Sequence, residues 1–143
     1  MPLTVPAPSG QILMLQYILG LASVKTGFTA SSTNGPVLRL FRNDPNPAIS
    51  TATVLGDIAE CTSAGYAPIT LVSSGWSVSQ PGGVTTGSYA QQAFTFGTNA
   101  VAYGYYVTDP ANNLLWIERF SGAPFSIPDG GGSVTISSKI TLG

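Results

Sequence analysis

The sequence predicts an all-β protein: an antiparallel β-sandwich of jelly-roll type, with a short N-terminal helix and an extended N-terminal arm. Two observations favour the β class. Seven or eight short apolar or alternating segments follow one another from position 37 onwards, at intervals of about eight to fifteen residues. Gly-, Pro- and Asn-rich turns separate these segments. A third observation, one apolar stripe at helical spacing near the N-terminus, predicts the helix.

The first eight residues, MPLTVPAP, are expected to form an extended arm ahead of a single domain at 9–143. Pro2, Pro6 and Pro8 fix φ and disfavour helix in the residues before them. Leu3 and Val5 lie on alternate sides of such an arm and can serve as apolar anchors. We therefore expect the arm to form an interface with a neighbouring chain.

A short helix is expected at about 9–20. Ser9 is a suitable N-cap, the apolar residues that follow have helical spacing, and Gly20 offers a stop. The apolar run at 12–22 is too short to cross a bilayer. A signal peptide would require Lys or Arg before this run, and none is present there. No membrane partner is expected.

The strands are expected within eight segments of the remaining chain. In the last of these, apolar and polar residues alternate, which predicts a strand with one face in water or against a partner. Its apolar positions are Val134, Ile136, Ile140 and Leu142. The segments are VLRLF (37–41), YAPITLV (66–72), WSVSQ (76–80), SYAQQAFTF (88–96), VAYGYYVTD (101–109), LLWIERF (114–120), FSI (125–127) and SVTISSKITL (133–142).

A central hairpin is expected between Tyr103 and Phe120. Its connection is DPANN, and Thr108 should pair with Leu114 across it. Glu118 and Arg119 are adjacent and should point to opposite faces. This register places Tyr106 opposite Trp116, Tyr105 opposite Ile117, Gly104 opposite Glu118, and Tyr103 opposite Arg119.

Both faces of this hairpin would be apolar, so the hairpin is expected to contribute either core or interface. The second apolar face requires a second layer, which can be a helix, a loop or a neighbouring subunit. One face would carry Tyr105, Val107, Leu115 and Ile117, with Arg119 lying along Tyr103, and the other Tyr106, Trp116 and Phe120.

The charge of the chain is low and nearly balanced. Charged residues make up 8% of the 143 residues and the formal net charge is -1. Five scattered basic residues cannot form the positive surface that nucleic acid requires. A mean hydropathy of +0.27 suggests that other chains cover part of the apolar surface. These values favour an assembly subunit and argue against a nucleic-acid partner.

The residues of common active sites are missing or isolated. The chain has no histidine, which excludes Ser-His and Cys-His nucleophile pairs and imidazole metal sites. Asp57 and Glu60 are expected to be solvated or to cap a turn, and Cys61 to be a buried structural thiol. NDPNP and PDGGGS lack calcium-loop spacing. We expect no enzyme, no catalytic residue, no cofactor and no metal.

In order and spacing, LRLFRNDPNP, GYAPITL, YAQQAFTF, YGYYVTD, LLWIERF and KITLG resemble segments of small uncharacterised proteins encoded among the virion-structure genes of tailed bacteriophages, cyanophages included. The resemblance covers roughly residues 9–143 and rests on packing and turn motifs. It implies a capsid cement or decoration protein that binds the major capsid protein or other virion proteins. Such a protein would be located in the virion, after assembly in the host cytoplasm.

Two further roles stay open at this point. The resemblance also allows a tail, neck or baseplate component. A receptor- or glycan-binding module is a third possibility, and it would use Trp76, Tyr89 or Tyr106 if these rings were exposed. For a capsid subunit we expect a homo-oligomer, with a trimer favoured.

Overall fold

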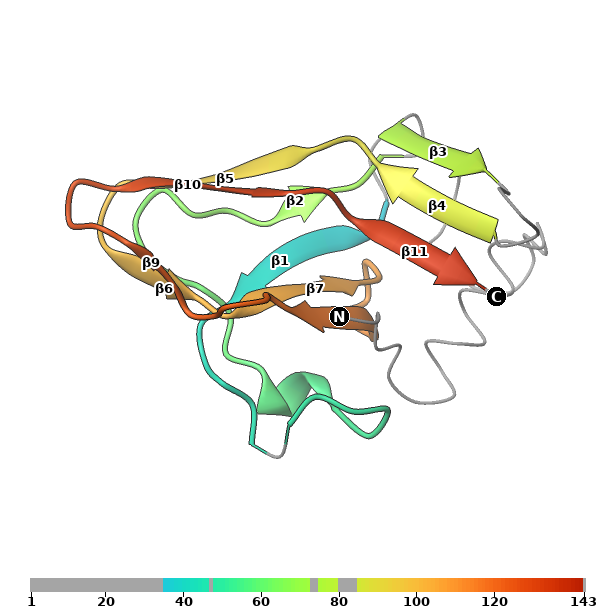
Figure 1. Cartoon of the computed structure of the whole chain (residues 1–143), viewed down its shortest axis with the longest axis horizontal. Helices are drawn as coiled ribbons and strands as arrows, with labels where there is room; N and C mark the ends of the chain where they lie inside the picture. Colours follow the sequence, from blue (N-terminus) through green and yellow to red (C-terminus); the bar gives the residue numbers. More distant parts are fainter. Residues whose placement is uncertain (1–34, 47, 73–74, 80–84, 143) are drawn as a thin grey trace.

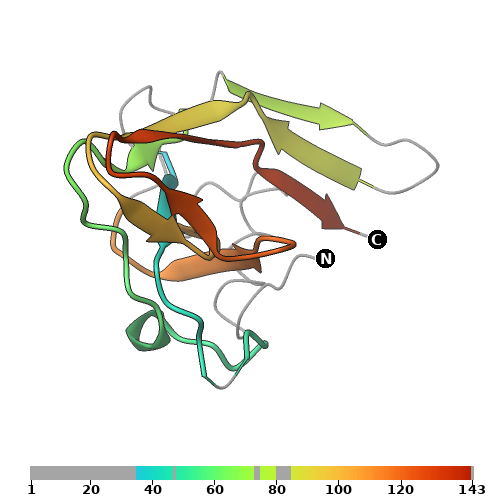
Figure 2. The same ribbon diagram turned by 60° about the vertical axis from the view of Figure 1, so that its left-hand side comes forward.

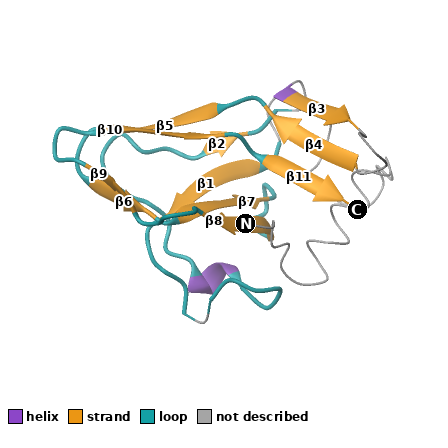
Figure 3. Ribbon diagram, in the orientation of Figure 1, coloured by secondary structure: helices purple, strands orange, loops and turns teal. Residues whose placement is uncertain are grey.

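The computed structural model describes residues 35–46, 48–72, 75–79 and 85–142, so the predicted arm at 1–8 and helix at 9–20 lie outside the described part. The all-β antiparallel class is confirmed (Figure 1, Figure 3). The elements are β1 (Val37–Phe41), the 3-10 turn η1 (Leu55–Asp57), β2 (Ile69–Thr70), β3 (Trp76–Ser79), β4 (Thr85–Tyr89), β5 (Gln92–Phe96), β6 (Ala100–Ala102), β7 (Gly104–Thr108), β8 (Leu114–Arg119), β9 (Phe125–Ile127), β10 (Gly132–Ile136) and β11 (Lys139–Leu142).

The second half of the chain is one long hairpin folded over on itself. Strands β4, β5, β6 and β7 form one arm, and β11, β10, β9 and β8 pair with them in that order. The tip of the hairpin is the turn at 109–113. Figure 2 shows the two arms curving together from the β4–β11 end to the β7–β8 end. The remaining strands join at the sides: β1 pairs with β7, β2 with β1, and β3 with β4. The jelly-roll type stays a prediction.

The central core lies between the four-stranded sheet β2-β1-β7-β8 and the β5–β10 pair. In Figure 1 these two layers lie one above the other. Burial of this apolar surface is the main force that holds the layers together. The sheet contributes Leu38, Leu40, Tyr105, Val107, Leu115 and Trp116, and the opposite layer contributes Phe94, Phe96 and Ile136.

A second, smaller cluster covers the outer face of the four-stranded sheet. Phe41, Tyr106 and Ile117 are buried there against Ile49, Leu55 and Ile58. The last three belong to the segment 42–60, which carries η1 and lies below the sheet in Figure 1. Within the described part of the chain, the second layer expected over the hairpin is therefore a loop.

The predicted register of the β7–β8 hairpin is wrong beyond its first pair. Thr108 pairs with Leu114 as expected, but the register shifts there and Val107 pairs with Trp116. Leu115 is the extra residue of a β-bulge. The bulge exchanges the predicted faces, because Trp116 lies in the central core and Ile117 in the outer cluster. After the bulge, Tyr106 faces Ile117, Tyr105 faces Glu118, and Gly104 faces Arg119.

Three predicted strands are each divided in two. The segment 133–142, for example, forms β10 and β11, which pair with β5 and β4. Between the pairs Ile136–Gln92 and Lys139–Ser88, residues 89–91 oppose residues 137–138, so one arm has one residue more than the other. The two arms bend at this point (Figure 1). The predicted segments 88–96 and 101–109 are likewise divided, the first at the boundary of β4 and β5 and the second at the boundary of β6 and β7.

The predicted wet face of the last segment is confirmed. Residues 133, 135, 137, 139 and 141 are exposed, whereas Val134, Ile136 and Ile140 pack on the central core. Within the described ranges, no helix has the length and apolar character needed to span a membrane.

Candidate functional site

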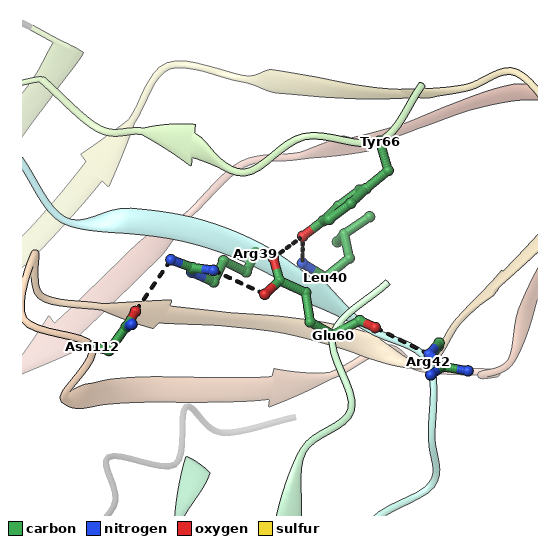
Figure 4. Close-up of polar contacts among 6 residues, drawn as sticks. All are labelled: Arg39, Leu40, Arg42, Glu60, Tyr66 and Asn112. Atoms are coloured by element: carbon green, nitrogen blue, oxygen red, sulfur yellow. Dashed lines mark hydrogen bonds and ion pairs between the residues drawn. The ribbon is translucent and has the colours of Figure 1, made fainter. Parts of the chain in front are cut away.

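A cluster of polar side chains lies beside β1, where the segment 59–61 pairs with the strand. The backbone N–H of Cys61 donates to the Leu40 carbonyl at 2.9 Å, and that of Arg42 donates to the Ala59 carbonyl at 2.8 Å. This pairing places Glu60 next to Arg39. The Arg39 Nη1 to Glu60 Oε2 distance is 2.8 Å, and both side chains are mostly buried (Figure 4).

Two further residues complete this β1 polar network, which we define as Arg39, Glu60, Tyr66 and Asn112. The Tyr66 hydroxyl donates to Glu60 Oε1 at 3.0 Å and accepts from the Leu40 N–H at 3.0 Å. Arg39 Nη2 donates to Asn112 Oδ1 at 3.2 Å. Figure 4 shows these groups converging from β1, the 59–66 segment and the hairpin tip. Both carboxylate oxygens of Glu60 therefore have partners.

Two phenols near Glu60 are held in the protonated form. Burial raises the pKa of Tyr66 well above its usual value, and the neighbouring Glu60 carboxylate raises it further. Burial likewise raises the pKa of Tyr106, again with a contribution from Glu60. A general base must be able to accept a proton near neutral pH, which these phenols cannot do. The network is suited to holding structure.

Asp57 and Glu60 have separate hydrogen-bond partners. Asp57 Oδ2 accepts the Val54 N–H at 3.0 Å at the start of η1, which confirms the predicted role of Asp57 as a turn cap. Glu60 belongs to the β1 polar network instead. Its partners Arg39 and Tyr66 were not predicted, because no local motif connects them in sequence.

A second ion pair ties the 42–60 segment to the hairpin. Arg119 binds both carboxylate oxygens of Asp44, at 3.0 and 3.1 Å. Hydrogen bonding from Arg119 holds the pKa of Asp44 below its usual value. The guanidinium carbon also lies 5.8 Å from the centre of the Tyr103 ring, so the predicted contact of Arg119 with Tyr103 is confirmed.

Glu118 faces Tyr105 across the hairpin, whereas the predicted register placed it opposite Gly104. The Tyr105 hydroxyl donates to Glu118 Oε2 at 2.6 Å, across the β7–β8 pair. Burial is the main reason why the pKa of Tyr105 is raised, and Glu118 adds to the effect. This carboxylate is thus engaged in an internal contact.

Cys61 is buried, as expected, and its Sγ lies 3.6 Å from the Val101 carbonyl oxygen. Burial raises the pKa of this thiol to about 11, so almost no thiolate exists at neutral pH. Among the described residues, no three His, Cys, Asp or Glu side chains are placed to hold a metal ion.

Apolar side chains reach the surface at the β6–β9 pair. Phe125 is 51% exposed and Val101 is 39% exposed. Phe120 packs edge-on against Phe125, with 5.5 Å between the ring centres, and also contacts Tyr105. We refer to Phe120 and Phe125 as the aromatic rim. Of these two, the sequence had indicated only Phe120, because FSI is too short to show which of its residues is exposed.

The aromatic residues considered for glycan binding are mostly internal. Tyr89 and Tyr106 are buried, and Trp76 is half-buried, with its ring edge-on to Tyr89 and Trp116. Trp116 is in the central core. The predicted arm residues Pro2, Leu3, Val5, Pro6 and Pro8 lie outside the described part of the chain.

Comparisons with known proteins give no family for this chain: no protein-family model, no curated protein and no solved structure matched it.

Proposed function

We propose that this protein is a non-enzymatic structural subunit of a phage virion, a capsid cement or decoration protein that binds and stabilises neighbouring coat proteins. One observation supports this most strongly. In the described part of the chain, five of the six carboxylates, all but Asp129, have internal hydrogen bonds, whereas the apolar side chains of Val101 and Phe125 are exposed. Most carboxylates are therefore engaged in internal contacts, whereas exposed apolar groups remain available for contact with a partner.

The aromatic rim has the chemical character of a protein interface. Interface cores are enriched in aromatic residues and depleted of charge. Between Arg119 and Asp129 the chain carries no charged side chain, and Phe125 lies in the middle of this stretch. Burial of an unpaired charge is costly, so a stretch without charged side chains suits a contact surface.

The proposed partners are the major capsid protein or other virion proteins, and the protein itself is proposed to be a small symmetric homo-oligomer, with a trimer favoured. The near-zero net charge supports self-association, because it gives little repulsion between copies. In this proposal the protein assembles onto particles in the host cytoplasm and remains in the virion.

Particle binding tests this proposal. Particles assembled without the gene are mixed with purified protein, sedimented and assayed for bound subunits. We expect saturable binding to capsids by the wild type and a clear loss of binding with Phe125→Ser. Val54→Ser is the matched control, because Val54 is 56% exposed but belongs to the 42–60 segment. Binding to isolated tails and not to capsids would favour the tail, neck or baseplate role. Binding to neither would contradict the proposal.

A further inference from the structure

The turn between β9 and β10 carries an exposed Asp-Gly pair. The Gly131 N–H donates to the Pro128 carbonyl at 2.9 Å, so Asp129 and Gly130 are the two central residues of a tight turn. Both are exposed. The carboxylate of Asp129 has no hydrogen-bond partner among the described residues. A carboxylate without a partner thus lies next to the backbone N–H of an exposed glycine.

The other three aspartates of the chain lack this combination. Asp44 and Asp109 each precede a proline, whose nitrogen carries no hydrogen. Asp57 precedes the β-branched Ile58, and its carboxylate already accepts the Val54 N–H. Asp129 alone is followed by glycine, which allows the backbone rotation needed to bring nitrogen and carboxyl carbon together.

We infer that Asp129 is a site of spontaneous covalent modification, at which aspartate converts to isoaspartate. The Gly130 nitrogen attacks the Asp129 side-chain carboxyl carbon. The new C–N bond closes a five-membered succinimide, while the amide hydrogen and the carboxyl hydroxyl leave as water. Water then opens the ring. Attack at the main-chain carbonyl gives isoaspartate, and attack at the former side-chain carbonyl restores aspartate. The reaction needs no oxidant, reductant or cofactor.

The modification would alter the junction of two strand pairs. Isoaspartate adds one carbon to the main chain between β9 and β10. The next residue, Gly131, has a φ of 81° and packs so closely on β5 that a side chain there would overlap the Phe96 carbonyl oxygen. We expect a longer turn to disturb this contact or the present strand register. The inference is independent of the proposed function, since it concerns only the chain's own chemistry.

The experiment is a time course on the purified full-length protein at neutral pH and raised temperature. Digested samples are analysed by fragmentation mass spectrometry that separates aspartyl from isoaspartyl peptides of equal mass. We expect the peptide with Asp129 to divide into two forms with time, while the peptides with Asp44, Asp57 and Asp109 stay single.

Two variants make the result specific. Asp129→Glu keeps the charge but would require a six-membered ring, so the isoaspartyl form should be lost. Gly130→Ala should slow the conversion several-fold, and it should fold normally because a Cβ at this position meets no neighbouring atom within 4 Å. Absence of isoaspartate at position 129 in the folded protein, when the urea-unfolded chain forms it, would overturn the inference. Equal conversion at Asp57 would also overturn it.

Discussion

At the level of single residues, the β1 polar network shows how this chain uses its few charges. Arg39 and Glu60 are 21% and 27% exposed at their side chains, so water screens their attraction only in part. Glu60 also accepts a hydrogen bond from the Tyr66 hydroxyl, which in turn accepts one from the Leu40 N–H. Removal of one member leaves several polar groups without partners.

Glu60→Ala should therefore lower the free energy of unfolding by about 2 kcal/mol, because an arginine and a phenol lose their acceptor in a mostly buried place. Urea unfolding followed by circular dichroism measures this change. Asp44→Asn is the control, since it breaks an exposed ion pair and should have a clearly smaller effect. Equal losses for the two variants would show that the network has no special role in stability.

Cys61 should be unreactive in the native protein. Its thiol is buried and has a pKa of about 11, raised from 9.0, so the folded state favours the protonated form. The stability that this preference contributes is present at neutral pH and is lost as the pH rises from about 9 to about 11. Labelling with a maleimide at neutral pH should be slow in buffer and complete in urea. Rapid labelling of the folded protein would contradict the burial.

At the level of the strands, Gly104 sets how closely β7 can approach its neighbours. Gly104 pairs with Phe41 on one side and Arg119 on the other. A Cβ here would overlap the Glu118 carbonyl oxygen and the Phe41 ring. Both neighbours are packed, and Phe41 is fully buried. No side chain can be added without displacing the sheet or the outer cluster.

Gly104→Ala should cost about 1–3 kcal/mol of stability, the usual penalty for forcing extra volume into a packed site. Thermal or urea unfolding measures it. Gly56→Ala, on η1, is the matched control because its Cβ would lie in open space. The same small effect for both substitutions would contradict the close packing of Gly104 against Phe41.

Alternation and turn residues in the sequence were enough to predict the β class and the wet face of residues 133–142. They could not predict the bulge at Leu115. Trp116 and Ile117 are both apolar, so a shift by one residue leaves two apolar faces and the pattern is the same in either register. The β1 polar network was also missed, because Arg39 and Glu60 meet only after the 59–61 segment pairs with β1.

At the level of the whole molecule, the purified protein should be an oligomer. The neutral surface gives little repulsion between copies, and the aromatic rim exposes apolar area that association would bury. Sedimentation equilibrium at micromolar concentration should give a mass that is a multiple of 14.7 kDa, with a trimer favoured. A mass of 14.7 kDa at every concentration would contradict this expectation.

Locating the protein in an intact particle tests most directly the proposal that it is a structural part of a virion. Purified particles would be reconstructed by cryo-electron microscopy, with mass spectrometry of the same sample to identify their proteins. We predict density on the capsid surface that fits the folded-over hairpin of strands β4 to β11, with the aromatic rim against a coat protein. Particles of full infectivity that lack the protein, while the host lysate contains it, would contradict the claim.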